Sequence, residues 1–407
     1  MEIRLNILLQ FGKRVYNKNM AINLVSDTID REDIVGVINW LNQKEIPQLT
    51  KGPITKKYEE KFSSWLGASS SVFVNSGSSA ILLGLTALKF GGKLKNNKIV
   101  VPDLSWATDV SSPLILGMDT FLVDCNLYDL SADLEHLEQI FKEEEPAAFI
   151  LVSVLGLVPN MQRIVSLCNK YEVLLIEDTC ESLGSEFIGQ KLGTFGCMSF
   201  FSTYFGHHIS TIEGGMVATS DKEINDLLLM TRSHGWDRDL DAEAAKKLAD
   251  KEGISDFDRL FTFYTPGLNV RATDLQAVIG LKQVDKIDRF SKIRNDNFLH
   301  FSKRLQDSNS LIKPIQRPGD FISSFCYPVM LEEKREECVA ELKANDIACR
   351  PLIAGSLSKS PMWKNFGDYT PNNRNAELVD KTGFYVPNHQ GMTTNDVDKI
   401  CDIIKKY

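Results

Sequence analysis

Short apolar runs alternate with segments of helical spacing as far as residue 233 of this chain. This alternation predicts a mostly parallel sheet with right-handed crossovers and helices packed against it. In such sheets, ligands gather at the carboxyl ends of the strands. The expected strands are residues 71–74, Lys98–Pro102, Thr120–Asp124, Ala147–Val154, Val173–Asp178, Gly196–Phe201 and Met216–Thr219. The expected helices are Asp30–Gln43, Ile54–Leu66, Ile81–Phe90, Ser105–Leu116, Ser131–Lys142, Pro159–Tyr171 and Lys222–Ser233.

The C-terminal part has a different order of elements. Pro266–Gly280 leads into a long helix that we expect to run to about Leu305. A smaller α/β unit follows, with strands at Phe325–Leu331 and Ile347–Pro351 and helices at Lys334–Asn345 and Thr394–Lys406. We therefore predict an N-terminal arm of residues 1–30, a large domain of residues 31–285 and a small C-terminal domain of residues 286–407.

Charge and hydropathy exclude two classes of partner. The 46 Lys and Arg stand against 54 Asp and Glu, so the net charge is −8, which argues against a general nucleic-acid binder. A local basic pocket would still suffice for an anionic substrate. The longest apolar run, Ala147–Val158, is shorter than the roughly 20 residues that a membrane-spanning helix needs. No signal peptide is apparent, so we expect no membrane association.

The eight cysteines are scattered, without a CxxC pair or a metal-like spacing. Small buried thiols of this kind are typical of a protein of the reducing cytoplasm. The charged segment Asp237–Arg259 contains no cysteine and predicts either a solvated helical insertion or a mobile flap. We predict no metal site, because such a site needs three or four converging ligands.

The stretch Ser199–Met216, SFFSTYFGHHISTIEGGM, is the strongest candidate for chemistry. Apolar strand-like pieces flank a polar loop that carries His207 and His208, and Gly214-Gly215 permits a tight turn directly after it. An imidazole can act as a general base near neutral pH, so His207 is our first catalytic candidate. A purely structural role for both histidines is the alternative.

A second candidate site follows the first predicted strand of the sheet, in SVFVNSGSSA. A strand, a glycine turn and a helix start leave free N–H groups and a positive helix end, which together favour an anion. An ordinary turn with a serine cap is the alternative.

Several motifs together resemble the DegT/StrS type of sugar aminotransferases. They are NSGSSA, IEDTCES, FGHHISTIEGG, RSHGWDR, PGLNVR, CRPLIAG and NHQ. The family's loop reads roughly Ser-Phe-x-x-x-Lys-x-x-x-x-x-Glu-Gly-Gly, and here His207 stands at the position of its Schiff-base lysine. Within the family, this histidine resembles the signature of the sugar 3-dehydratases. The resemblance implies the aspartate-aminotransferase-like fold (fold type I) and a homodimer with shared active sites.

The resemblance also implies a cofactor, pyridoxal 5′-phosphate (PLP), together with its amine form, pyridoxamine 5′-phosphate (PMP). Gly77, Ser78 and Ser202 match the phosphate cradle, and Asn269 matches a residue that reaches the phosphate from the neighbouring subunit. Asp178 matches the partner of the pyridine nitrogen, and Trp106 the aromatic that stacks on the ring. Glu181 stands where many of the family's aminotransferases carry a glutamine.

His207 cannot form an imine, because imidazole has no primary amine. The implied reaction removes the C3 hydroxyl of a nucleotide-linked 4-keto-6-deoxy sugar, releases ammonia and uses L-glutamate to restore PMP. The resemblance favours GDP as the carrier. A CDP-specific relative holds an iron–sulfur cluster through clustered cysteines, and the matching region Asp237–Arg259 contains none, which disfavours an iron–sulfur centre here. These residues do not identify the base, so the choice between GDP and CDP stays open. A sugar aminotransferase altered at this lysine and an inactive PLP or sugar-nucleotide binder stay open.

Substrate contacts are the least specific part of the pattern. Arg238, Arg271 and Arg350 are candidates for holding the nucleotide diphosphate or a carboxylate of the amino donor, because a guanidinium binds such groups with two donors. Each could equally form a surface salt bridge. His208 either orients His207 or contacts the sugar.

Overall fold

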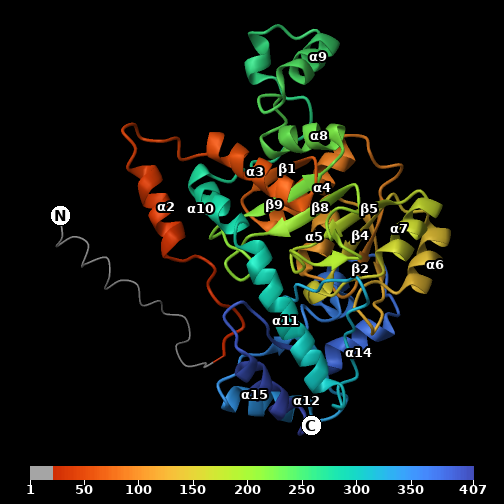
Figure 1. The fold of residues 1–407 in the computed structure, drawn as a ribbon. Coiled ribbons are helices and arrows are strands. Elements are labelled where there is room, and N and C mark those ends of the chain that lie inside the picture. Colours follow the sequence, from red (N-terminus) through yellow and green to blue (C-terminus); the bar gives the residue numbers. More distant parts are fainter. Residues whose placement is uncertain (1–21) are drawn as a thin grey trace.

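The structure is a computed structural model and describes residues 22–407. The predicted N-terminal arm of residues 1–30 therefore lies mostly outside the described residues. Figure 1 shows the large sheet in the middle of the molecule, the C-terminal elements below it and helix α9 projecting at the top.

The large sheet has seven strands in the order β1-β9-β8-β5-β4-β2-β3. β9 is antiparallel to both of its neighbours, and all other pairs are parallel. The predicted mostly parallel sheet is therefore confirmed. Its strands are β1 Ser70–Val74, β2 Lys98–Pro102, β3 Asp119–Val123, β4 Ala148–Val152, β5 Leu174–Asp178, β8 Met198–Ser202 and β9 Gly215–Thr219. A two-stranded hairpin, β6 Glu186–Phe187 and β7 Gln190–Lys191, joins β5 to β8.

Helices cover the large sheet (Figure 1). They are α3 Pro53–Leu66, α4 Gly77–Phe90, α5 Ala107–Ile115, α6 Leu134–Glu144, α7 Met161–Lys170, α8 Lys222–Arg232 and α10 Asp274–Val284, and α2 Arg31–Leu41 packs on the outer side against α10. Helix α2 starts where predicted, because Asp30 caps it in a capping box with Asp33. Helix α3 ends at Gly67, whose φ of +90° suits glycine.

Helix α4 packs directly against β8 and β9 and begins earlier than predicted. Its first residue is Gly77 rather than Ile81, because the side chain of Ser76 accepts a hydrogen bond from the N–H of Ser79 and caps the serine-rich first turn. Gly84 allows the close approach: a β-carbon there would lie 2.5 Å from the ring of Phe200 on β8. This packing brings the start of α4 beside the end of β8.

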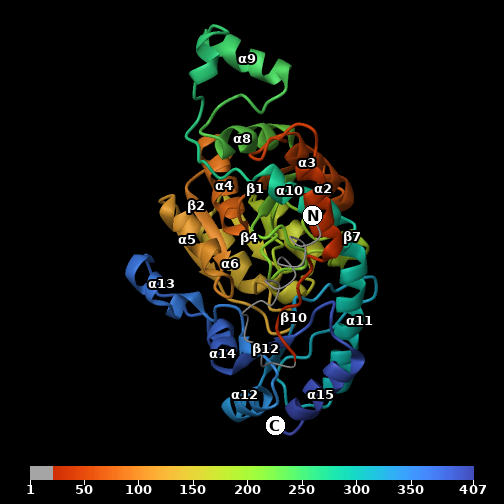
Figure 2. The ribbon, with the colours of Figure 1, turned by 90° about the vertical axis from the view of Figure 1, so that its left-hand side faces the viewer.

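The C-terminal part contains a three-stranded antiparallel sheet, β10-β12-β11. Its strands are β10 Cys326–Met330, β11 Arg350–Pro351 and β12 Gly383–Pro387, and its helices are α12 Arg335–Ala344, α13 Pro361–Phe366, α14 Arg374–Thr382 and α15 Thr394–Ile404. The sequence pattern predicts no element at α13, α14 or β12, and it predicts a longer strand than the two residues of β11. Figure 2 shows α11, Ile287–Leu305, running from the large sheet to these elements.

The single long helix predicted as far as Leu305 is two helices, α10 and α11. Lys286 lies in the break and turns toward the start of α2, where its Nζ atom is 2.6 Å from Asp33 and 2.7 Å from Asp30. The predicted boundary between large and small domains, at residues 285 and 286, falls at this break and stays a prediction.

The charged segment Asp237–Arg259 forms helix α9, Ala242–Glu252, which projects from the body beyond α8 (Figures 1 and 2). Of the two predictions for this segment, the structure shows the helical insertion. After it, the aromatic side chains of Phe257 and Phe261 are 81% and 75% exposed.

Candidate active site

The ends of β1, β5 and β8 bring the predicted site residues of the large sheet together. The start of α4 meets the end of β8 so closely that a β-carbon on Gly77 would lie 2.8 Å from Cβ of Ser202. Only glycine fits there. β5 pairs with β8 and places Asp178 opposite Phe200, two residues before Ser202. Three segments distant in sequence thus meet at one place, which we call the corner: it contains Gly77, Asp178 and Ser202.

The first turn of α4 offers donors to an anion. The N–H groups of Gly77 and Ser78, at the first two helical positions, have no carbonyl partner within the helix. The hydroxyl of Ser78 lies 3.0 Å from Oγ1 of Thr108 on α5. Free N–H groups, a serine hydroxyl and the neighbouring Ser202 are suited to a phosphate group.

Asp178 is buried at the end of β5, 5% exposed. Its Oδ1 accepts a hydrogen bond of 2.9 Å from the N–H of Cys180. Burial raises the pKa of Asp178, and hydrogen bonds from Cys180 and from Asp109 oppose this rise. Asp109, on the first turn of α5, was not predicted as a site residue.

Glu181 follows on the same loop and faces the neighbouring segment η1, Val154–Gly156. Its Oε2 accepts a hydrogen bond of 2.8 Å from the N–H of Leu155, which is held at a φ of +52°. Burial raises the pKa of Glu181 to about 7, a hydrogen bond from Leu155 opposes the rise, and the charge of Asp178 adds to it. This carboxyl therefore changes its charge near neutral pH.

His207 lies in a loop held in place at both ends. Thr203 donates its N–H to Gly214 and accepts one from Thr211, so the loop closes on itself. The ring of His207 lies 5.3 Å from that of Phe325, between centroids. Its Nδ1 atom is buried and has no hydrogen-bond partner within residues 22–407. Burial lowers the pKa of His207 to about 4, so the imidazole is a neutral base at pH 7.

His208 points into the same region but is held differently. It is 1% exposed, and its Nε2 lies 2.8 Å from the carbonyl oxygen of Ser323. Its ring centroid is 5.9 Å from that of Phe325. Burial lowers the pKa of His208 well below its ordinary value. Phe325 thus lies beside both histidines.

Arg294 on α11 fixes the segment that faces the histidines, and sequence reasoning missed it. It is 2% exposed and donates to the carbonyl oxygens of Ser324, Phe325 and Asn388, at 3.3 and 3.0 Å for the first two. Burial lowers the pKa of Arg294 to about 10. Its place among the charged residues of a long amphipathic helix gave no signal of this role.

The other predicted residues lie around this corner or away from it. Trp106 occupies the N-cap position of α5, where its side chain makes no capping hydrogen bond and is 57% exposed. Arg350 on β11 pairs with Tyr385 on β12 and forms a side-chain hydrogen bond with it. Burial and then the charges of Cys326 and Glu181 raise the pKa of Tyr385. Tyr385 of the small sheet is therefore close enough to Glu181 to be affected by its charge. The structure does not bring Arg238 there: it stacks on Trp236, 3.8 Å from the ring centroid, at the base of the α9 extension.

Asn269 and Arg271 follow the extension in the chain and run beside the end of β1. Asn269 is exposed and forms a β-bridge with Ser233, and Arg271 forms one with Val74. Both are near the end of β1, just before the turn at Ser76.

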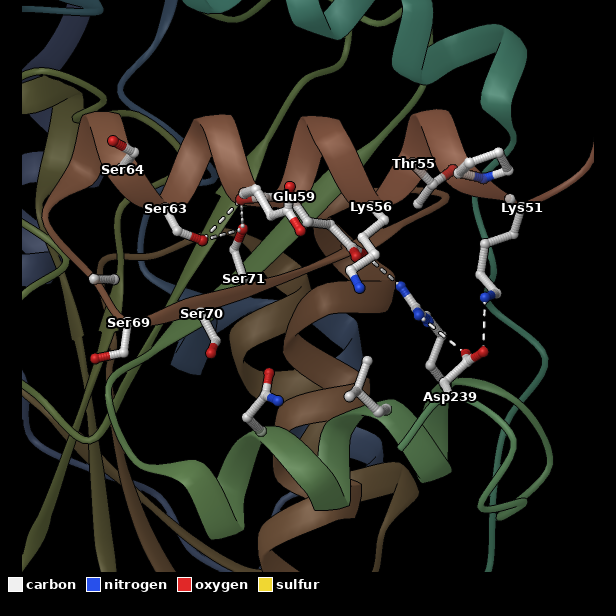
Figure 3. Close-up of a pocket in the computed structure, with 17 residues that line it drawn as sticks. Lys51, Thr55, Lys56, Glu59, Ser63, Ser64, Ser69, Ser70, Ser71 and Asp239 are labelled. Atoms are coloured by element: carbon white, nitrogen blue, oxygen red, sulfur yellow. Dashed lines mark hydrogen bonds and ion pairs between the residues drawn. The ribbon is translucent and has the colours of Figure 1, made fainter. Parts of the chain in front are cut away.

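A separate groove of about 630 Å³ lies between α3, β1 and α8 (Figure 3). Glu59 and Asp239 are paired there with Arg232, at 2.5 and 3.1 Å, and Lys51 is 2.8 Å from Asp239. The groove's lining contains none of the predicted site residues. Within residues 22–407, no three His, Cys, Asp or Glu side chains are grouped to hold a metal ion, and no helix has the length and apolar character to span a membrane.

Comparison with known proteins gives the family. Residues 28–405 match the model of the DegT/DnrJ/EryC1/StrS aminotransferase family. The chain belongs to this family. The predicted recognition is confirmed, and so is the fold class, because this family member shares its fold with a solved structure of GDP-4-keto-6-deoxymannose-3-dehydratase.

That structure contains a trapped PLP-glutamate geminal diamine and matches with a TM-score of 0.86 at 32% identity, covering 94% of this chain and 100% of the other. Two curated relatives of the chain described here are GDP-4-keto-6-deoxy-D-mannose 3-dehydratases. The Escherichia coli O55:H7 enzyme is 32% identical over 391 residues, which cover 94% of this chain and 99% of the relative. The Yersinia pseudotuberculosis enzyme is 33% identical over 392 residues, 94% and 98% of the two chains.

Proposed function

We propose that this protein is a PLP/PMP-dependent sugar 3-dehydratase, a lyase that acts on a nucleotide-linked 4-keto-6-deoxy sugar. GDP-4-keto-6-deoxy-D-mannose is the first candidate substrate, as in the two curated relatives. The observation that carries the proposal is the imidazole of His207, in the family's lysine position, with a buried Nδ1 atom that has no partner among the described residues.

The residues of the corner fit the cofactor. The close contact of Gly77 with Ser202 and the free N–H groups at the start of α4 suit its phosphate. Asp178 is the acid for the pyridine nitrogen, and the exposed face of Trp106 is available to the ring. When bound, the cofactor supplies an amine for the keto group of the sugar and a ring that accepts electrons. Asp178 favours the protonated ring nitrogen, because a nearby anion stabilises a cation.

His207 moves the proton. Its neutral imidazole can accept a proton from C4′ of the cofactor, which allows the hydroxyl at C3 of the sugar to leave as water. Its pKa of about 4 keeps it unprotonated over the whole neutral range. Glu181, with a pKa of about 7, is placed to exchange a proton in the same region.

The overall reaction balances without another reductant. The sugar exchanges its C3 hydroxyl for hydrogen, which is a two-electron reduction. L-Glutamate is converted to 2-oxoglutarate and ammonia, which is the matching two-electron oxidation, and the water released from the sugar equals the water consumed in freeing the ammonia. Each sugar reduced therefore yields one ammonia and one 2-oxoglutarate.

Substrate contacts follow from the same arrangement. Arg350, paired with Tyr385 whose hydroxyl also senses the charge of Glu181, is the best placed of the three arginines for an anionic group of the sugar nucleotide or of glutamate. Arg271 lies near the end of β1 and can serve the same purpose there. His208 orients the Ser323–Phe325 segment, since its ring nitrogen bonds to Ser323.

We further propose a homodimer whose active sites are shared. Trp106, Tyr204 and Ile212 are 57%, 43% and 52% exposed around the site, and a second copy would cover them. Asn269 is exposed beside the end of β1 and would reach the neighbouring site. The cytoplasmic location stays a prediction, and all eight cysteines are free thiols in the structure.

One incubation tests the proposed function. The purified protein, PLP, L-glutamate and GDP-4-keto-6-deoxy-D-mannose should give ammonia, 2-oxoglutarate and a sugar lacking its C3 oxygen in equal amounts. A parallel reaction with a CDP-linked 4-keto-6-deoxyglucose tests the carrier. An amine retained on the sugar would identify an aminotransferase, and no turnover on any carrier would identify a binding protein.

A further inference from the structure

Asp109 is a buried acid that the proposed reaction does not yet use. It lies on the first turn of α5, three residues after Trp106, and is 0% exposed. No N–H or O–H group of the described residues has hydrogen-bonding geometry toward either of its carboxyl oxygens. The side chain of Asp178 is its hydrogen-bond partner: the bond between the two carboxyl groups raises the pKa of Asp109 and lowers that of Asp178.

Two buried carboxyl groups can share a hydrogen bond only if one of them carries a proton. Asp178 accepts a hydrogen bond from the N–H of Cys180, which favours its charged form. Among the described residues, Asp109 has no donor of ordinary hydrogen-bonding geometry, and the backbone of Trp106 is the last-ranked influence on its pKa. The proton therefore belongs to Asp109 and the negative charge to Asp178.

The remaining surroundings support the same assignment. Burial and then the charge of Asp178 raise the pKa of Asp109 well above its ordinary value, and the charge of Glu181 adds to this. The positive end of α5 works in the other direction, but a helix end contributes only about 0.3–1 kcal/mol. Complete burial shifts the pKa of a carboxyl group by up to about 3–5 units, so burial prevails.

We propose that Asp109 is a positioning residue that stays protonated and donates its O–H to Asp178, holding Asp178 ionised and oriented for the ring nitrogen of the cofactor. The proposal rests on the cofactor site of the proposed function. A neutral donor has an advantage over a cation here: it supports the negative charge without cancelling it, so Asp178 keeps its full effect on the ring.

The proposal also explains why Asp109 and Trp106 share the start of one helix. The N–H of Asp109 donates to the carbonyl oxygen of Trp106 at 3.1 Å. Through this turn, the residue proposed to stack on the ring and the residue proposed to hold Asp178 are fixed relative to each other.

The first test measures the proton itself in the protein without added cofactor. At pH 7, the infrared difference spectrum between the wild type and Asp109→Asn should show the carbonyl stretch of one protonated carboxylic acid. Asn is isosteric and its amide still donates, so the variant is expected to fold. The absence of that band would overturn the proposal.

The second test measures PLP binding with Asp109→Asn, Asp109→Leu and Asp109→Ala. The Asn variant should bind PLP as the wild type does and keep the ¹⁵N shift of a protonated ring nitrogen in ¹⁵N-labelled PLP. Leu and Ala remove the donor, so they should weaken binding at least about tenfold and move the shift toward the unprotonated form. A purely structural residue would lower the melting temperature of these variants and leave the ¹⁵N shift unchanged, which would overturn the proposal.

These measurements use PLP alone and no sugar nucleotide. A failure of the dehydratase proposal would appear in the product assay of the wild type, whereas a failure of this inference would appear in the ¹⁵N shift and the infrared band. The two outcomes are therefore distinguishable.

Discussion

Gly77 and Ser202 lie so close together that the β-carbon of any other residue at position 77 would be 2.8 Å from Cβ of Ser202. The two residues come from the start of α4 and the end of β8. Their contact joins the two segments that would hold the cofactor phosphate. It is possible because residue 77 is glycine, which has no β-carbon.

Gly77→Ala is therefore expected to separate α4 from β8. We predict a loss of stability of about 1–3 kcal/mol, because overpacking forces the backbone to shift, and at least a tenfold loss of PLP affinity. Thermal unfolding and fluorescence titration with PLP measure the two effects. Gly36→Ala on α2 is the matched control: no atom lies within 4 Å of the added carbon, so it should bind PLP normally and lose no stability. If the two variants had equal stability and equal PLP affinity, the proposed phosphate-binding role of Gly77 would be refuted.

His207→Asn should abolish sugar reduction and leave the fold intact. Loss of a general base lowers the rate by about 10²–10⁴-fold, and asparagine cannot replace it. PLP should still bind, since its phosphate and ring contacts lie elsewhere. The measurement is ammonia release under single-turnover conditions together with a PLP titration. An unimpaired variant would remove His207 from the reaction.

His208→Asn gives the contrasting result. His208 is held by Ser323, so its loss should lower the melting temperature and affect the rate less than the change at His207. If His208→Asn lost more rate than His207→Asn, His208 would be the general base and His207 the structural residue.

Glu181→Gln should change the dependence of stability on pH. The pKa of Glu181 in the folded protein, about 7, lies above the ordinary value of 4.5. Between these values the folded protein keeps a proton that the unfolded chain has released, so this stabilising contribution is lost as the pH rises through 7. Gln carries no charge and can still accept the N–H of Leu155. The variant should gain about 1–3 kcal/mol relative to the wild type between pH 4.5 and 8.

Urea unfolding across this pH range measures the difference. Glu143→Gln on the exposed face of α6 is the control and should give no such trend. If the difference at position 181 stayed constant with pH, the carboxyl would not be titrating near neutrality.

Arg294→Lys should weaken both stability and activity. Lysine lacks the planar fork that reaches three carbonyl groups, and each buried acceptor left without a donor costs about 1–3 kcal/mol. The Ser323–Phe325 segment would then shift beside the histidines. Arg289→Lys, on the exposed side of the same helix, should have little effect on melting temperature or turnover.

Local patterns explain what the sequence predicts well. Asp178 and Ser202 end apolar strands, and Ser76 precedes a glycine turn, so their places at the strand ends follow from the alternation of strands and helices. Asp109 and Arg294 could not be found in this way. One resembles an ordinary acidic residue of a first helical turn, and the other a charged residue of a long helix. Their roles come from contacts with segments 69 and 30 residues away, Asp178 and Ser324.

The separation of α10 from α11 was missed for the same reason. Helical spacing continues through residue 286, and the break coincides with the ion pairs between Lys286 and the start of α2. A contact that spans some 250 residues leaves no trace in the local pattern.

Borohydride reduction in the presence of PLP tests most directly the claim that position 207 carries a base and no amine. Peptide mass spectrometry should find no phosphopyridoxyl group on any lysine of the wild type. In His207→Lys, it should find the group at residue 207. An adduct on a lysine of the wild-type protein would contradict the claim.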